Sequence, residues 1–355
     1  MNTTLDFSEL NQMIGQLFMA GLPGKELDAG TESLIRDYNP GGLILFSRNV
    51  KDPIQVATLC RDIQTATVKY HGRQMFLAVD QEGGRVTRLR RPFTEFPGNE
   101  AIGSSADPVN KAIEFGRITA LELKLVGINM DFAPVMDVRR GELDKVLEGR
   151  TFGDDPEVVC LLGATIIRTL QENGIMAVAK HFPGLGETCI DPHFQIPIIN
   201  TDFETLETIN LPPFFSAIKA NVSGIMTSHA IYPAIDAYHP ATLSAFVLKE
   251  LLRVKMGFEG LIISDDLEMG AIANGVGVAK GAAESLMAGA DIFLVCENQG
   301  YIKECVELIL GMVLRGEISD TRLYKSHERI EMVRSRFLNR EITVSLEQVK
   351  KYFRL

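Results

Sequence analysis

The chain has 355 residues, 46% of them hydrophobic and 23% charged, and its formal net charge is −10. This composition is typical of a globular protein whose length fits one large barrel or two smaller domains. The acidic balance argues against a basic surface that follows phosphate groups, and therefore against a nucleic-acid partner.

The amino-terminal segment has no pattern of a membrane or secretory signal. Residues 1–11 are polar and acidic, and the apolar run at 13–22 is too short to cross a bilayer. Five scattered cysteines without a CxxC pair indicate a reducing compartment. We therefore expect a cytoplasmic protein without a membrane partner, whereas no pattern indicates an oligomeric state.

Short apolar runs alternate with longer helical patterns along the chain. The predicted strands are eight runs at residues 17–22, 43–46, 75–80, 128–134, 175–181, 224–229, 261–265 and 291–296. The clearest helical patterns between them lie at 109–125, 156–172, 244–255 and 280–288. Alternating elements favour a parallel sheet, and eight strands at this length predict an α/β fold of the (β/α)8 TIM-like barrel type. An open doubly wound sheet is the alternative, but no GxGxxG follows an early strand.

The whole chain, 1–355, is predicted to form a single domain, because no linker or low-complexity tract divides it. Residues 297–315 and 318–338 have the apolar spacing of amphipathic helices. We expect the carboxyl-terminal part, about 298–355, to pack on the barrel and to close its outer ring.

Titratable side chains stand at or near the carboxyl ends of five predicted strands. They are Asp80, Asp131, His181, His229 and Asp265. A barrel brings those strand ends to one rim, so residues far apart in the sequence become neighbours around a pocket. We therefore expect the functional site at that rim.

Two of these strand ends carry additional polar residues. The segment 180–193, KHFPGLGETCIDPH, contains an aspartate two residues before a histidine. Asp191 can hold the imidazole of His193 and set its tautomer, as acid/base catalysis requires. Asp265 ends the seventh predicted strand and Asp266 follows it directly, at a place where an aspartate can serve as nucleophile, metal ligand or helix cap. Since side chains alternate along a strand, we expect these two aspartates to face different ways.

Several sequence blocks resemble glycoside hydrolase family 3. Residues 251–265 are similar to the nucleophile signature of the family, and residues 180–193 are similar to its bacterial β-N-acetylglucosaminidase branch. Further similar blocks are GGLILF (41–46), DQEGGRV (80–86), FAPVMDV (132–138), RTFG (150–153), SHAIYP (228–233) and PATLS (240–244). The blocks occur in family order, and this makes the resemblance specific.

The resemblance implies a retaining glycosidase. Asp265 would form a covalent glycosyl-enzyme, and His193, partnered by Asp191, would act as acid and base. The residues that would hold the sugar in the −1 subsite are Asp80, Arg88, Arg150, Lys180 and His181. We expect structural or supporting roles for Asp131, Asp137 and His229, and we expect neither a metal nor a cofactor.

Two positions depart from the pattern of the family. Glu268 stands three residues after the proposed nucleophile, where the family usually has a small residue, and Leu185 stands where many relatives have histidine. Both departures could alter the aglycone side of the site.

The resemblance alone implies the substrate, terminal β-linked GlcNAc on peptidoglycan-derived fragments. A family 3 glycoside phosphorylase and a β-glucosidase or β-xylosidase remain alternatives on the same barrel. Different chemistries would be a metal-dependent hydrolase using His181, His193, His229 and Asp265, or a Schiff-base aldolase using Lys180. A non-catalytic sugar-binding barrel is the alternative outside the enzymes.

Overall fold

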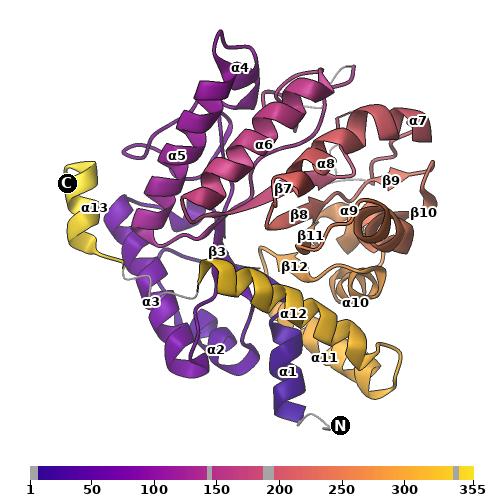
Figure 1. Ribbon diagram of the computed structural model, residues 1–355. Helices are drawn as coiled ribbons and strands as arrows, with labels where there is room; N and C mark the ends of the chain where they lie inside the picture. Colours follow the sequence, from indigo (N-terminus) through magenta and orange to yellow (C-terminus); the bar gives the residue numbers. More distant parts are fainter. Residues whose placement is uncertain (1–6, 142–145, 187–195, 339–343) are drawn as a thin grey trace.

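The computed structural model describes residues 7–141, 146–186, 196–338 and 344–355. Within these ranges, eight strands form a closed barrel in which each neighbouring pair is parallel. In chain order the barrel strands are β1 (Phe18–Gly21), β2 (Gly42–Leu45), β3 (Phe76–Val79), β6 (Met130–Asp131), β7 (Met176–Phe182), β8 (Gly224–Thr227), β11 (Leu261–Asp266) and β12 (Ile292–Val295). Each overlaps one predicted run, so the predicted barrel is confirmed and the open sheet was the wrong alternative (Figure 1).

The barrel strands are short and almost entirely buried. Every residue of β2 and of β12 is buried, as expected for parallel strands that are covered on both faces. β11 differs at its end, where Asp265 and Asp266 are only partly buried. The apolar runs therefore mark the strands, and the polar residues that end them mark the rim of the barrel.

A ring of helices surrounds the barrel (Figure 1). Its members are α2 (Ala29–Tyr38), α3 (Pro53–His71), α5 (Pro108–Val126), α6 (Pro156–Glu172), α8 (Leu211–Lys219), η4 (Phe246–Lys255), α10 (Val278–Ala288) and α11 (Gly300–Leu314). In α3, Asp52 accepts a hydrogen bond from the Gln55 amide at 2.8 Å, and Gly72 ends the helix with a φ of 68°. These are the residue types that satisfy the free amides and carbonyls of helix ends.

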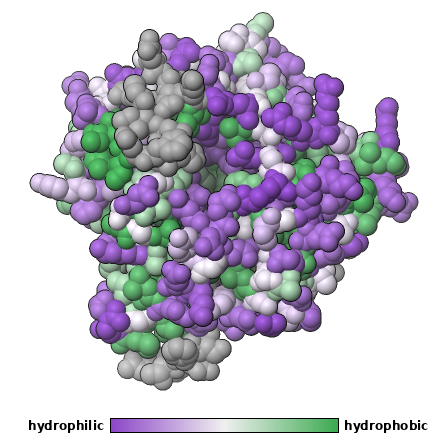
Figure 2. Space-filling view, turned by 180° about the vertical axis from the view of Figure 1, so that it is seen from behind, coloured by the Kyte–Doolittle hydropathy of each residue, from purple (hydrophilic) through white to green (hydrophobic). Residues whose placement is uncertain are grey.

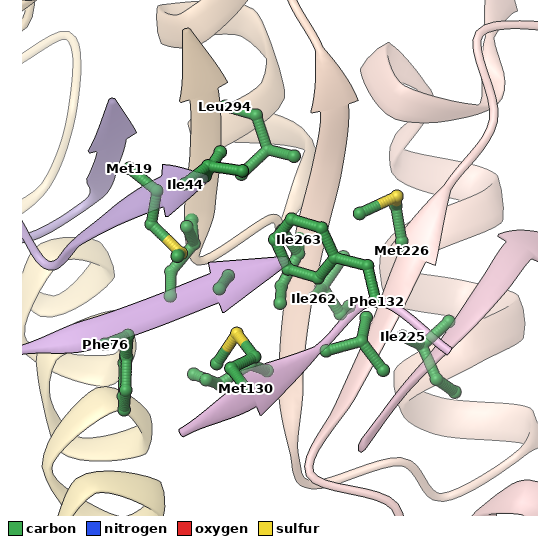
Figure 3. Close-up of a cluster of buried hydrophobic side chains, with 14 of the residues drawn as sticks. Met19, Ile44, Phe76, Met130, Phe132, Ile225, Met226, Ile262, Ile263 and Leu294 are labelled. Atoms are coloured by element: carbon green, nitrogen blue, oxygen red, sulfur yellow. The ribbon is translucent and has the colours of Figure 1, made fainter. Parts of the chain in front are cut away.

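Apolar side chains from most of the strands form a buried cluster in and around the barrel. Figure 3 shows this cluster, with the labelled residues Met19, Ile44, Phe76, Met130, Phe132, Ile225, Met226, Ile262, Ile263 and Leu294. All of them are at most 3% exposed. The barrel interior is therefore a packed core and not a channel.

The sequence did not predict a second group of elements, which lie in connections that follow barrel strands. In the described ranges they are the hairpins β4 (Gln81–Gly83) with β5 (Val86–Thr87) and β9 (Ile231–Tyr232) with β10 (Asp236–Pro240), and the short helices η1 (Ser47–Asn49), α4 (Asn99–Gly103), α7 (Phe203–Thr205), η2 (Leu206–Asn210), η3 (Ala241–Leu243) and α9 (Gly270–Ala273). Each is too short for a periodic hydrophobic pattern to reveal it. They build up the carboxyl rim, where barrel enzymes place their functional loops.

The remaining helices are α1 (Phe7–Gly15), α12 (Asp320–Phe337) and α13 (Leu346–Phe353). α13 packs against α3 and α5 on the outside. α12 was expected to join the outer ring, but its side chains reach residues that directly precede barrel strands: Arg334 bonds to Gln16, before β1, and Ser326 bonds to Asp291, before β12. These hydrogen bonds place α12 at the amino-terminal end of the barrel.

The surface on the side shown in Figure 2 is mostly hydrophilic, with hydrophobic side chains in separate patches. None of the helices in the described ranges combines the length and the apolar character that crossing a bilayer requires.

Asp291 is the polar centre of the amino-terminal end. Its fully buried carboxylate is paired with Arg253 and Arg329, and it accepts hydrogen bonds from the Ile262 amide at 3.0 Å and the Ser326 hydroxyl at 2.7 Å. Removing one partner of a buried ion pair leaves the other charges uncompensated, which costs far more than the pair contributes.

We predict that Asp291→Asn lowers the free energy of unfolding by about 3–5 kcal/mol, the typical cost of breaking a buried pair. Denaturant unfolding of the purified variant measures this change. The control is Asp62→Asn, which breaks an exposed pair with Arg61 and should change stability little. Equal effects of the two substitutions would contradict the role given to Asp291.

Candidate active site

A pocket of about 390 Å³ opens at the carboxyl ends of the strands. Its floor is formed by Ile44, Phe132, Met226 and Leu294, which belong to the buried cluster of Figure 3. Its polar lining residues are Asp80, Arg85, Arg88, Arg150, Lys180, His181, Asp265 and Asp266. An apolar floor with a few placed polar groups is typical of small-molecule sites.

Lys180, at the end of β7, is the centre of the polar wall. Its ammonium nitrogen lies 2.7 Å from Asp80 Oδ1 and 2.6 Å from Glu82 Oε1. Glu82 also receives two hydrogen bonds from Arg150, both at 2.8 Å, and the second oxygen of Asp80 lies 3.3 Å from Arg88. Charges of alternating sign thus run without a break across the pocket.

The opposite charges in this network outweigh the effect of burial. Burial by itself would raise the pKa of Glu82, but Arg150 and Lys180 bring the pKa well below its usual range. Lys180 and Arg88 likewise lower the pKa of Asp80 against the effect of burial. Burial opposes the charge of Lys180 too, but the two carboxylates raise its pKa. Asp80, Glu82 and Lys180 are therefore charged at neutral pH. The two carboxylates accept hydrogen bonds and the ammonium group donates them.

His181 is oriented by a buried carboxylate. Its Nδ1 lies 2.8 Å from Asp137 Oδ2, and Asp137 Oδ1 accepts hydrogen bonds from the amides of His181 and Leu185. A carboxylate at Nδ1 fixes the tautomer and leaves Nε2 as the ring nitrogen available to a ligand. Asp137, for which we expected a structural or supporting role, thus joins the imidazole to the base of the 180–193 segment.

Position 186, one residue after Leu185, requires glycine. A Cβ atom on Gly186 would lie 1.6 Å from the Val138 carbonyl oxygen, far inside the limit of real contacts. The carbonyl of Gly186 accepts the Arg140 amide at 2.8 Å, and the carbonyl of Gly184 accepts the Tyr232 hydroxyl at 2.8 Å. The start of the segment is therefore held closely against the connection that follows β6 and against β9 (Ile231–Tyr232).

Asp265 and Asp266 both line the pocket. We expected them to face different ways because strand side chains alternate, but the register of β11 against β12 shifts between Ile263 and Asp266. This irregularity breaks the strict alternation at the end of the strand. The Asp265 carboxylate accepts the Asp266 amide at 2.8 Å, and Asp266 accepts the amides of Glu268 and Cys296.

The charge of Asp266 differs from that of the carboxylates around Lys180. Burial, assisted by the nearby charges of Glu268 and Asp265, raises the pKa of Asp266 to about 7. No cation within the described ranges forms an ion pair with Asp266 closely enough to offset burial. Part of the Asp266 population is therefore neutral at neutral pH.

The structure brings together six of the eight predicted site residues. They are Asp80, Arg88, Arg150, Lys180, His181 and Asp265, all lining the one pocket. Of the neighbouring arginines, Arg85 and Arg88 line the pocket, and Arg88 is the more buried, since its side chain is 30% exposed against 48% for Arg85. Asp191 and His193 lie outside the described residues.

Sequence reasoning missed Glu82. Its position two residues after Asp80 was the available signal, since that spacing places side chains on one face of an extended segment. Its side chain is 1% exposed, and it binds both Arg150 and Lys180. Glu82 is thus the carboxylate that fixes the two cations expected to meet the substrate.

The other polar residues at strand ends lie deeper or to one side. Asp131 is fully buried and accepts the Gln81 amide at 3.0 Å. His229 lies 2.8 Å from the Thr242 hydroxyl and 2.9 Å from the Asp266 carbonyl oxygen. Within the described ranges, no group of three or more His, Cys, Asp or Glu side chains is arranged to hold a metal ion.

The two departures from the family pattern have distinct places. Leu185 is buried and lines the pocket, so it adds apolar surface where a histidine would add a polar ring. The Glu268 carboxylate accepts the amides of Glu297 at 2.6 Å and Asn298 at 3.0 Å. Glu268 therefore holds the segment between β12 and α11 and does not line the pocket.

Comparison with known proteins agrees with this geometry. Residues 9–333 match the glycosyl hydrolase family 3 N-terminal domain. A β-hexosaminidase of Tolumonas auensis is 38% identical over 283 residues, which cover 79% of this chain and 83% of that protein. A family 3 β-N-acetylglucosaminidase from Paenibacillus sp. str. FPU-7 superposes with a TM-score of 0.91 at 36% identity, covering 96% of this chain and 68% of that one.

A second solved structure extends the comparison to a ligand complex. NagZ from Neisseria gonorrhoeae, solved in complex with N-trifluoroacetyl-D-glucosamine, superposes with a TM-score of 0.75 at 29% identity. The superposition covers 95% of this chain and 96% of that one. The chain therefore belongs to glycoside hydrolase family 3, as its sequence blocks predicted, and its relatives include the bacterial β-hexosaminidases of that family.

Proposed function

We propose that the protein is a retaining exo-β-N-acetylglucosaminidase, which removes terminal β-linked GlcNAc from peptidoglycan-derived fragments. The observation that carries this proposal is the convergence of Asp265 with the charged network of Asp80, Glu82, Lys180 and Arg150 in one pocket with a closed floor. The names of its relatives, β-hexosaminidase and β-N-acetylglucosaminidase, support the sugar specificity. The peptidoglycan source and the cytoplasmic location are the finer parts of the proposal.

In the proposed first step, the Asp265 carboxylate attacks the anomeric carbon and forms a covalent glycosyl-enzyme. The bond to the leaving oxygen breaks as His193, partnered by Asp191, donates its proton to that oxygen. In the second step, His193 takes a proton from a water molecule, which attacks the anomeric carbon from the other face and frees Asp265. Two inversions give retention of configuration.

The network around Lys180 would position the sugar. Asp80 has carboxylate oxygens that can accept from two neighbouring hydroxyls, while Lys180 and Arg150 donate to hydroxyl or carbonyl oxygens. His181 offers Nε2 once Asp137 holds its other nitrogen. Because each of these groups already has its partner, little reorganisation is needed when the sugar binds.

The protonation of Asp266 affects this reaction. Below its pKa of about 7 the side chain of Asp266 is neutral and adds no negative charge beside Asp265. Above that pKa a second anion lies beside the nucleophile, and the two repel each other. We therefore expect the charge of Asp266 to contribute to both the stability and the pH profile of the enzyme.

The first prediction concerns substrate and nucleophile. Wild type should hydrolyse p-nitrophenyl N-acetyl-β-glucosaminide in preference to the β-glucoside, and Asp265→Asn should abolish turnover, because an amide cannot attack the anomeric carbon. Release of p-nitrophenol measures both, with Asp62→Asn as a control in α3. Preference for the glucoside would retain the family and contradict the substrate. Turnover that requires added phosphate would identify a phosphorylase.

The second prediction concerns the acid. His193→Ala should lower kcat/KM by roughly 10²–10⁴-fold for a disaccharide, whose leaving oxygen needs a proton. The loss should be much smaller for a p-nitrophenyl glycoside, because its leaving group needs little protonation. Steady-state kinetics on both substrates test this difference. Equal losses on the two would exclude His193 as the acid.

The third prediction concerns pH. The pKa of Asp266 is raised from an ordinary value of 3.8 to about 7, so the folded protein binds this proton more tightly than the unfolded chain does. The stability that it contributes is complete below about pH 4 and is lost as the pH rises to about 7, a loss of about 2–4 kcal/mol. In Asp266→Asn the free energy of unfolding should not show this decrease as the pH rises, because an amide does not titrate.

Urea unfolding of wild type and Asp266→Asn between pH 4.5 and 8 measures the effect. The difference in unfolding free energy between the two proteins should change across this range in favour of the variant as the pH rises. A constant difference would show that Asp266 titrates alike in the folded and unfolded chains.

A further inference from the structure

A second cavity lies at the opposite end of the barrel from the candidate active site. Its volume is about 640 Å³, and residues of η4, α10 and α12 line it. Arg253, in its wall, donates to the carbonyl oxygens of Phe258 at 2.7 Å and Gly260 at 2.6 Å, which directly precede β11. The cavity therefore opens beside the amino-terminal ends of the strands, where α12 also lies.

Positive charge predominates in this cavity. Its cationic lining residues are Lys249, Arg253, Arg322, Lys325 and Arg329. The carboxylates that line it are Glu250 and Glu317, and Glu317 is already paired with Arg315 at 2.5 Å. Even when the buried Asp291 is included, cations exceed carboxylates by two.

One carboxylate serves three of these cations. Asp291 is paired with Arg253, lies 3.2 Å from Arg329 and lies 3.7 Å from Arg322. Burial lowers the pKa of Arg253 to about 10, and the charges of Arg329 and Arg322 act in the same direction against the effect of Asp291. Burial also lowers the pKa of Arg322. The positive charge of the cluster is thus only partly compensated.

The cations divide into a structural group and an available group. Arg322 donates to the carbonyl oxygens of Leu286 and Ala290 and to the Ser326 hydroxyl, so it holds α12 against α10. The ammonium groups of Lys249 and Lys325 have no hydrogen bond or ion pair in the described part of the chain. These two lysines therefore have donors free for a ligand.

We propose that this cavity binds a small phosphate-bearing anion. A phosphate monoester or free phosphate carries about −1.5 to −2 charges at pH 7, which matches the excess of two cations, whereas a single carboxylate would neutralise only one. Lysine supplies point charges and arginine supplies paired N–H donors for phosphate oxygens. The hydroxyls of Ser319 and Thr321 line the same cavity and add neutral donors.

The volume indicates more than a bare ion. The cavity exceeds the candidate active site, which has about 390 Å³, so a group of the size of a sugar fits beside the phosphate. The two sites lie at opposite ends of the barrel, so the anion is not the glycosidic substrate. A ligand that joins η4, α10 and α12 would stabilise the end of the barrel that these helices cover.

The experiment is a thermal-unfolding titration of the purified full chain with inorganic phosphate, glucose 6-phosphate and glucose, at constant ionic strength adjusted with chloride. At ten times the Kd, binding should raise Tm by about 2 °C in a saturable manner. The Lys249→Ala/Lys325→Ala double variant should lose the saturable shift while keeping the wild-type Tm in chloride, because neither ammonium group has a structural partner.

The matched control is Lys111→Ala/Lys303→Ala, which removes two exposed lysines that pair with Glu114 and Glu307 elsewhere on the surface. It should retain the shift. Isothermal titration calorimetry of the same proteins gives the Kd without reference to folding. A larger affinity for glucose 6-phosphate would identify a phosphate ester as the ligand, and equal affinities would identify free phosphate.

Two results would overturn the proposal. One is a shift that grows linearly with phosphate and does not saturate, since excluded salts stabilise proteins in that manner. The other is a saturable shift that the Lys249→Ala/Lys325→Ala variant retains, which would place the binding elsewhere on the molecule.

Discussion

The ammonium group of Lys180 is buried between two carboxylates, and the arrangement of the active-site pocket depends on it. A buried cation is stable only when opposite charges compensate it, so Asp80 and Glu82 must approach within 2.6–2.7 Å. Those carboxylates in turn fix Arg88 and Arg150. The segments that follow β3 and β6 are thereby held in one position relative to the end of β7.

A buried ion-pair cluster also holds the amino-terminal end of the barrel, but there the signs of the charges are reversed. There one carboxylate, Asp291, is buried among arginines of η4 and α12. At the carboxyl rim, anions surround a cation and leave hydrogen-bonding atoms facing a pocket. At the amino-terminal end, cations surround an anion and join two helices to the start of β12. The same physical interaction thus serves binding at one end of the barrel and closure at the other, which agrees with the usual division of roles in barrel enzymes.

The barrel could be predicted from sequence because its strands are continuous apolar runs that end at polar residues. The eight runs overlap the eight barrel strands in the described ranges. The hairpins β4–β5 and β9–β10 could not be predicted, since strands of two to five residues contain too little periodicity. The place of α12 depended on long-range partners such as Asp291 and Gln16, which no local pattern reveals.

Like the barrel, the site was predicted where it depends on strand ends, and it was missed where it depends on partners remote in sequence. Residues at strand ends converge by topology, and the family resemblance selected those that line the pocket. Glu82 was missed because its role depends on two partners, Arg150 and Lys180, that are remote in sequence. The expectation that Asp265 and Asp266 face different ways was wrong because a register shift is a property of the paired strands and not of either one alone. The roles of Asp191 and His193 remain predictions.

The charges in the pocket also bear on why a histidine would serve as the acid. Asp80, Glu82, Asp265 and Asp266 already bring four carboxyl groups to the rim, and the last of them is partly neutral at neutral pH because burial and its neighbours disfavour another negative charge. A further carboxylate in the acid role would become anionic after giving up its proton. In the proposed mechanism this is the moment when Asp265 carries the glycosyl group, from which it must later leave as an anion. A histidine becomes neutral instead, and so adds no repulsion to that step. An acid/base of this kind is thus the one that a pocket so rich in carboxyl groups favours.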